Sequence, residues 1–126
     1  GLYDANSGNF EFINAGHLSP IIVREDGSIE TKKSGHRILG VIPSPFTTDR
    51  IKLNPKDRLI LYSDGVTETF SPSDEVFGEE RLRKFLLQSK DIPPKNLLNN
   101  LKTTLQEFRK GSDLTDDISL IYLKRL

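Results

Sequence analysis

One stretch near the middle of the chain, Arg58-Leu59-Ile60-Leu61-Tyr62-Ser63-Asp64-Gly65, decides the fold that the sequence predicts. The nearly continuous apolar run at 58–62 is typical of a strand that is buried on both faces in the interior of a sheet. Ser63-Asp64-Gly65 follows directly, and glycine allows a sharp exit and the close approach of another backbone. We therefore expect a central strand that delivers a carboxylate to one end of a sheet.

Several further strands are expected before this central strand. Turn signals at 6–8, 25–28 and 54–57 bound segments that alternate in polarity or are rich in β-branched residues. The expected strands cover residues 9–13, 20–24, 29–32 and 46–53, of which the second and third form a hairpin and the last is an edge strand. The short apolar segment 37–41 lies between them, so the first half of the chain is predicted to be mostly extended.

Two amphipathic helices and a final strand are expected after the central strand. The first helix begins near Gly78, where Glu79 and Glu80 suit a helix N-terminus, and Pro93-Pro94 closes it and opens the second. The apolar face of the second helix, which ends at Gly111, consists of Leu97, Leu98, Leu101, Leu105 and Phe108. A strand at 118–123 follows. Many strands, two helices and one strand predict an α+β fold.

Composition and charge limit the possible classes of protein. The 126 residues suit one domain, 1–126, and the 18 basic and 18 acidic residues give neither the basic excess of a nucleic-acid binder nor an acidic tail. The absence of cysteine excludes disulfides, thiolate metal sites and a cysteine nucleophile. No apolar run is long enough to span a bilayer, and the first residues, Gly1-Leu2-Tyr3-Asp4, lack the basic-then-apolar pattern of a secretory signal. We expect a cytoplasmic segment without direct membrane contact, whether or not the parent protein is membrane-tethered.

The acidic residues Asp64, Asp116 and Asp117 are the candidate metal ligands. Asp64 ends the central strand, and Thr115-Asp116-Asp117 directly precedes the last strand. If the two strands are neighbours, three carboxylates converge, and like charges about 4 Å apart repel by roughly 4 kcal/mol unless a cation or a raised pKa offsets the repulsion. Carboxylates favour Mn²⁺ or Mg²⁺ over zinc. Alternatively, both motifs have only a structural role, because Asp-Gly is a common turn dipeptide and Asp-Asp before a strand is often part of a solvated loop.

The two histidines, His17 and His36, each follow a glycine in a predicted loop. Either could act as a ligand, a base or a substrate contact, but a lone loop histidine is more often a structural hydrogen-bonding residue. The sequence contains no Gly-x-Ser-x-Gly elbow and no phosphate-binding glycine-rich loop with a lysine.

Taken together, the motifs resemble the stage II sporulation protein E family of PPM-type phosphatases. The resemblance spans nearly the whole chain and depends on an ordered series of motifs that is more specific than any one of them. In chain order these are Asn14-Ala15-Gly16-His17, Leu39-Gly40-Val41, the segment from Asp57 to Glu68, Phe77-Gly78 and Asp116-Asp117-Ile118-Ser119-Leu120.

This resemblance implies a sandwich of two antiparallel sheets flanked by helices and a metal-dependent protein phosphatase. The implied substrate is phosphoserine or phosphothreonine on a regulatory protein, such as an anti-sigma-factor antagonist. The resemblance makes Asp64 and Asp116 ligands of a two-metal Mn²⁺ or Mg²⁺ site and Asp117 a group that orients a ligand or water. It also places Asn14–His17 in a turn near the site, and the segment 66–77 in a switch that positions Asp64.

One departure from the family pattern concerns the start of the chain. Family domains begin with strands that carry a Gly-Asp motif with further aspartates, whereas Asp4 is the sole early aspartate here and falls in a turn. We therefore expect a truncated domain, incomplete at its N-terminal side, with an incomplete metal site, weak or absent activity and uncovered sheet edges that promote self-association. An alternative is an inactive phosphatase-like module that binds a regulatory protein, and a third is an unrelated β-rich domain.

Overall fold

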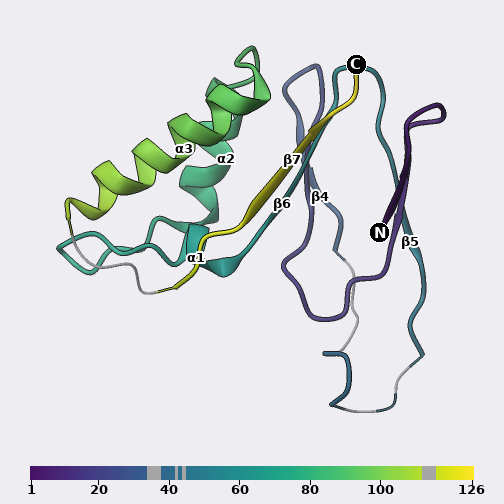
Figure 1. Ribbon diagram of the computed structural model, residues 1–126, viewed down its shortest axis with the longest axis horizontal. Coiled ribbons are helices and arrows are strands. Elements are labelled where there is room, and N and C mark those ends of the chain that lie inside the picture. Colours follow the sequence, from purple (N-terminus) through teal and green to yellow (C-terminus); the bar gives the residue numbers. More distant parts are fainter. Residues whose placement is uncertain (34–37, 42, 44, 112–115) are drawn as a thin grey trace. The chain divides into compact units, whose positions relative to one another are not determined.

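The computed structural model describes residues 1–33, 38–41, 43, 45–111 and 116–126. These residues form strands and helices in the predicted order, many strands, then helices, then one strand (Figure 1). The elements are β1 (Leu2–Asp4), β2 (Asn9–Phe12), β3 (Ile21–Val23), β4 (Ile29–Thr31), β5 (Asp49–Lys52), β6 (Arg58–Tyr62), α1 (Asp64–Thr67), α2 (Gly78–Gln88), α3 (Pro94–Arg109) and β7 (Leu120–Lys124).

The strands form two sheets. The first has the order β1-β2-β5 and the second the order β4-β3-β6-β7. The pairs β1–β2, β2–β5, β3–β4 and β3–β6 are antiparallel. β6 therefore lies inside its sheet, next to β7, and β5 lies at an edge, which confirms both predictions. The short apolar segment at 38–41 is an exposed turn.

The chain divides into two compact units, and the first comprises Gly1–Leu61 with Leu123–Leu126. Its core is built from side chains of both sheets, because alternate residues of each strand point to the same side. Phe10 lies opposite Ile51 in the first sheet, and Ile22 lies opposite Leu59 in the second. The buried members of this core are Phe10, Phe12, Ile22, Ile51, Leu53 and Leu59.

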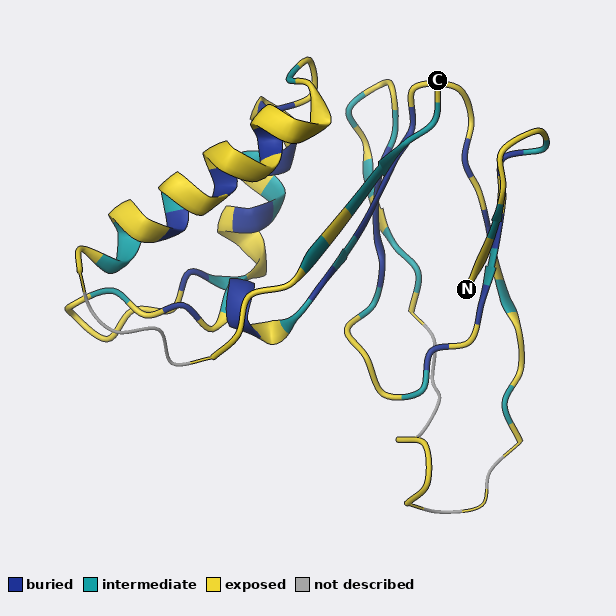
Figure 2. Ribbon diagram, in the orientation of Figure 1, coloured by how far each residue is buried: buried dark blue, intermediate teal, exposed yellow. Residues whose placement is uncertain are grey.

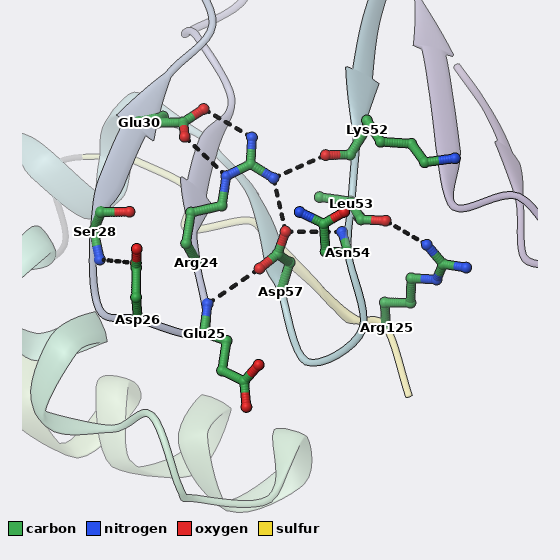
Figure 3. A network of polar contacts seen from close by, with 10 residues as sticks. All are labelled: Arg24, Glu25, Asp26, Ser28, Glu30, Lys52, Leu53, Asn54, Asp57 and Arg125. Atoms are coloured by element: carbon green, nitrogen blue, oxygen red, sulfur yellow. Dashed lines mark hydrogen bonds and ion pairs between the residues drawn. The ribbon is translucent and has the colours of Figure 1, made fainter.

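A polar network joins the β3–β4 hairpin to the turn before β6 (Figure 3). Asp57 is 2% exposed, and its carboxylate accepts hydrogen bonds from Arg24 Nη1 at 2.7 Å and from the backbone N–H groups of Asn54 at 2.8 Å and Glu25 at 3.1 Å. The same guanidinium pairs with Glu30 at 2.8 Å. Contact with Arg24 lowers the pKa of Glu30 below its ordinary value. The buried carboxylate is thus fully engaged by the strands around it.

The second unit, Tyr62–Tyr122, contains the helices. Pro94 begins α3 where its missing N–H costs nothing, and Lys110 ends the helix in a left-handed conformation with φ of 48°. Figure 2 shows a buried stripe along α3, which consists of Leu97, Leu101 and Leu105. Leu98, predicted to share that face, is instead 39% exposed. No helix of the described residues is long and apolar enough to cross a membrane.

Candidate functional site

Ser63 connects the two acidic segments within the second unit. Its backbone N–H donates to the carbonyl oxygen of Ser119 at 3.0 Å, and the Ser119 N–H donates to Ser63 Oγ at 2.9 Å. Ser63 Oγ in turn donates to the carbonyl oxygen of Asp117 at 3.1 Å. The structure therefore brings the end of β6 and the start of β7 together. No role was predicted for Ser63, although its position directly after a buried strand could have indicated that its hydroxyl bonds a neighbouring segment.

Gly65 allows the two segments to lie in direct backbone contact. A Cβ added at this buried position would lie 2.4 Å from the carbonyl oxygen of Asp117 and 3.4 Å from that of Asp116. Such a distance is shorter than real side chains tolerate, so only glycine fits without a shift. Gly65 is not among the described glycines with a positive φ. The close approach of another backbone is therefore the reason for glycine here, as the sequence predicted, and not a left-handed turn.

The three predicted carboxylates are exposed and each is held locally. Asp64 Oδ1 accepts the Gly65 N–H at 3.0 Å, and Asp116 Oδ1 accepts the Asp117 N–H at 2.7 Å. Across the described ranges, no group of three or more histidine, cysteine, aspartate or glutamate side chains is placed to hold a metal ion. The acidic segments are thus neighbours, while the convergence of three carboxylates expected from the sequence is not formed by these residues alone.

The donor set suits a hard divalent cation in its chemistry. Carboxylate oxygens are the ligands that Mn²⁺ and Mg²⁺ prefer, and exposed carboxylates are free to exchange a backbone hydrogen bond for a cation. Two such ions need more ligands than Asp64, Asp116 and Asp117 supply. The residues present therefore fit part of a metal site.

Hydrogen bonds fix the segment that follows Asp64. α1 begins at Asp64, whose carbonyl oxygen accepts the Glu68 N–H at 2.7 Å. Thr69, which is 4% exposed, donates its hydroxyl to the Gly65 carbonyl at 2.8 Å, and its own carbonyl accepts the Phe77 N–H at 2.8 Å. The loop 69–77 is thereby closed onto α1. Just before the site, burial raises the pKa of Tyr62 above its ordinary value.

Asn14 shapes the predicted turn in the first unit. Its Oδ1 accepts the N–H groups of Gly16 at 3.1 Å and His17 at 2.8 Å, and its Nδ2 donates to the His17 carbonyl at 2.9 Å. His17 takes part in this turn through its backbone N–H and carbonyl groups. His36 lies outside the described residues.

Comparisons with known proteins agree with this architecture. A family model described as stage II sporulation protein E (SpoIIE) matches residues 1–126. Protein IcfG of Synechocystis sp. is 36% identical over 126 residues, which cover 99% of this chain and 20% of that protein.

Two solved structures show the same fold. The SiaA-PP2C domain of Pseudomonas aeruginosa matches with a TM-score of 0.82 and 18% identity, over 94% of this chain and 47% of that one. The phosphatase domain of the cell fate determinant SpoIIE from Bacillus subtilis, presoaked with Mn, matches with a TM-score of 0.73 and 16% identity, over 98% and 53%. The predicted α+β phosphatase fold is therefore confirmed, and the chain spans a fifth of the curated relative and about half of each solved chain.

Proposed function

We propose a function from one premise: this chain belongs to the stage II sporulation protein E family, a family of phosphatase domains. The proposed activity is metal-dependent hydrolysis of phosphoserine or phosphothreonine on a regulatory protein, for which this chain supplies part of the site. The observation that carries the proposal is the junction of β6 and β7. There Ser63 and Gly65 hold the segment of Asp116 and Asp117 against that of Asp64.

Asp64 and Asp116 are proposed to hold Mn²⁺ or Mg²⁺, with Asp117 orienting a ligand or a water molecule. The chemistry supplied by a bound divalent cation is activation of water and neutralisation of charge on the phosphoryl oxygens. The chain's own contribution is to position the carboxylates. Ser63 fixes the spacing of the two acidic segments, and the exposure of the carboxylates leaves them accessible to a cation and a phosphate.

The remaining acidic ligands are proposed to come from a region of the longer relatives that this chain does not span. Three carboxylates are too few for two ions, and family domains carry an early Gly-Asp motif with further aspartates. The isolated chain is therefore expected to bind Mn²⁺ weakly. A longer protein that contains this chain is expected to bind Mn²⁺ tightly.

The proposed substrate is a phosphorylated regulatory protein of the anti-sigma-factor-antagonist type. The family resemblance supports this class, since members act in signal transduction and sigma-factor regulation. The balanced charge of the chain agrees with a protein substrate and favours no nucleic acid.

The test is calorimetric titration with Mn²⁺ of this chain and of a longer protein that contains it, each followed by a phosphate-release assay on a phosphoserine protein. In the longer protein, Asp64→Ala and Asp116→Ala should weaken Mn²⁺ binding at least tenfold and lower kcat/KM by about a hundredfold or more, because each removes a carboxylate held at the junction. Asp117→Ala should have a smaller effect.

Asp91→Ala is the matched control, because Asp91 is an exposed aspartate in the connection between α2 and α3. It should change neither Mn²⁺ binding nor turnover. If both Asp64→Ala and Asp116→Ala retain full activity, the site assignment is wrong. A different outcome is that the longer protein binds the phosphoprotein but does not bind Mn²⁺ and releases no phosphate. In that case the alternative function, an inactive module that binds a regulatory protein, replaces the proposed enzymatic activity.

A further inference from the structure

A groove of about 500 Å³ runs along α3 within the second unit. One wall is formed by α3 and the other by the segment that leads into β7, with Thr69 lining it as well. Asp117, one of the proposed site residues, is part of the second wall. A ligand in the groove would therefore extend toward the junction of the two acidic segments.

The groove presents apolar surface to solvent. Leu101 and Leu105 are each 3% exposed, whereas Leu98 and Ile118 are each 39% exposed. Leu98 is the residue that the helical pattern assigned to the buried face, and the structure places it beside the groove instead. Exposed leucine and isoleucine on facing walls can bury apolar side chains of a bound segment, at roughly 25 cal/mol for each Å² removed from water.

Two cations accompany this apolar surface. Lys102 and Arg109 line the groove and lie seven residues apart on α3, so they share one face of the helix. Neither forms a salt bridge with an acidic side chain of the described residues, whereas Arg83 of α2 pairs with Glu79. Within the part of the chain that the structure describes, both charges are therefore available to an anionic partner. The acidic side chain that lines the groove is Asp117, next to the proposed metal site.

We propose that this groove binds the segment of the phosphoprotein that flanks its phosphorylated residue, and that it selects a segment with leucine-like and acidic side chains. The inference rests on the proposed function, because Asp117, which lines the groove, is one of the proposed site residues. Charge complementarity decides the chemistry of the occupant: acidic residues lie beside Lys102 and Arg109, and apolar residues lie against Leu98 and Ile118. A segment rich in lysine is disfavoured.

The first test measures peptide binding to this chain by fluorescence anisotropy at low salt, where exposed charges are least screened. The probe is a labelled 12-residue phosphoserine peptide that carries leucines and glutamates on one side of the phosphoserine, and its counterpart has lysines in place of the glutamates. The glutamate peptide should bind about tenfold more tightly, the factor expected from two or more exposed ion pairs.

The variant Lys102→Glu/Arg109→Glu should abolish or reverse this preference. Lys90→Glu/Lys95→Glu is the matched control, because it reverses two exposed cations that do not line the groove. The control should keep the preference, and circular dichroism should show that all variants are folded. Equal binding of the two peptides, or the same loss of preference in both double variants, would overturn the proposal.

A second readout separates this proposal from the proposed function. In the longer protein, Lys102→Glu/Arg109→Glu should lower kcat/KM for the phosphoprotein about tenfold relative to a small phosphate ester. If the longer protein releases no phosphate but the peptide preference depends on Lys102 and Arg109, the enzymatic proposal fails and the groove remains a binding site. If phosphate is released and the preference is absent, the groove proposal alone fails.

Discussion

Gly65 stands where the two acidic segments meet, and it offers the sharpest test at the scale of a single residue. Gly65→Ala should lower the free energy of unfolding by about 1–3 kcal/mol, because the new methyl group would overlap the Asp117 carbonyl oxygen at 2.4 Å and must displace backbone. Urea titration followed by circular dichroism measures the change. In the longer protein the same substitution should also weaken Mn²⁺ binding.

The matched control for this prediction is Glu68→Ala, which introduces alanine at an exposed position directly after α1. It should change the free energy of unfolding by less than about 0.5 kcal/mol. If Gly65→Ala is as stable as the parent chain, the contact between Gly65 and Asp117 does not hold the two segments together.

The sequence predicted the positions of Asp64 and Gly65 because both follow from one local pattern, an apolar strand that ends in Ser63-Asp64-Gly65. It could not assign a role to Ser63, whose partners Asp117 and Ser119 lie more than fifty residues away in the chain. Leu98 shows that a local pattern can also predict burial where the structure has exposure. Its spacing fits the apolar face of a helix, and only the packing around α3 decides that it faces a groove.

At the scale of elements, the hairpin β3–β4 and the turn before β6 are held by a single buried carboxylate. Asp57→Ala should lower the free energy of unfolding by about 2–3 kcal/mol, because it leaves the backbone N–H groups of Asn54 and Glu25 without their acceptor and removes one acceptor of Arg24, which keeps its pairing with Glu30. Asp57→Asn should cost less, since an amide oxygen can still accept from a backbone N–H. Urea unfolding monitored by circular dichroism measures both.

Asp26→Ala provides a comparison within the same hairpin. Asp26 is exposed and accepts the Ser28 N–H at 2.8 Å, so its loss should cost much less free energy of unfolding than the loss of the buried Asp57. Equal losses for Asp57→Ala and Asp26→Ala would mean that the buried network contributes no more than a surface turn.

Elements with a strong local pattern were predicted closely. β6 has the predicted bounds, and α2 and α3 begin at Gly78 and Pro94, where acidic residues and proline favour a helix start. β1 and α1 were missed. β1 has only three residues and pairs with β2 across a turn, and α1 is a single turn, so neither is long enough to show a period.

At the scale of the whole molecule, the order of the elements was sufficient to predict an α+β fold, and the series of motifs pointed to the family. The sharing of the core between two sheets could not be predicted from periodicity alone, since alternation shows that a face is buried but not what covers it. The metal site is complete only when residues from several strands are brought together. Whether it is complete is therefore a property of the assembled domain, and local sequence patterns do not predict it.

Self-association is the last prediction, and it concerns the edges of both sheets. β7 is an edge strand of one sheet, and its residue Ile121 is 63% exposed. β1 is an edge strand of the other sheet, and its residue Leu2 is 72% exposed. The net charge of zero at pH 7 provides no electrostatic repulsion between copies of the chain. Sedimentation velocity should therefore show association that increases with concentration.

The substitution Ile121→Lys should reduce this association, because a lysine on an edge strand opposes pairing with another copy. Ser73→Lys adds the same charge in an exposed loop and should reduce association less; equal reduction would mean that net charge, and not the edge of β7, controls association.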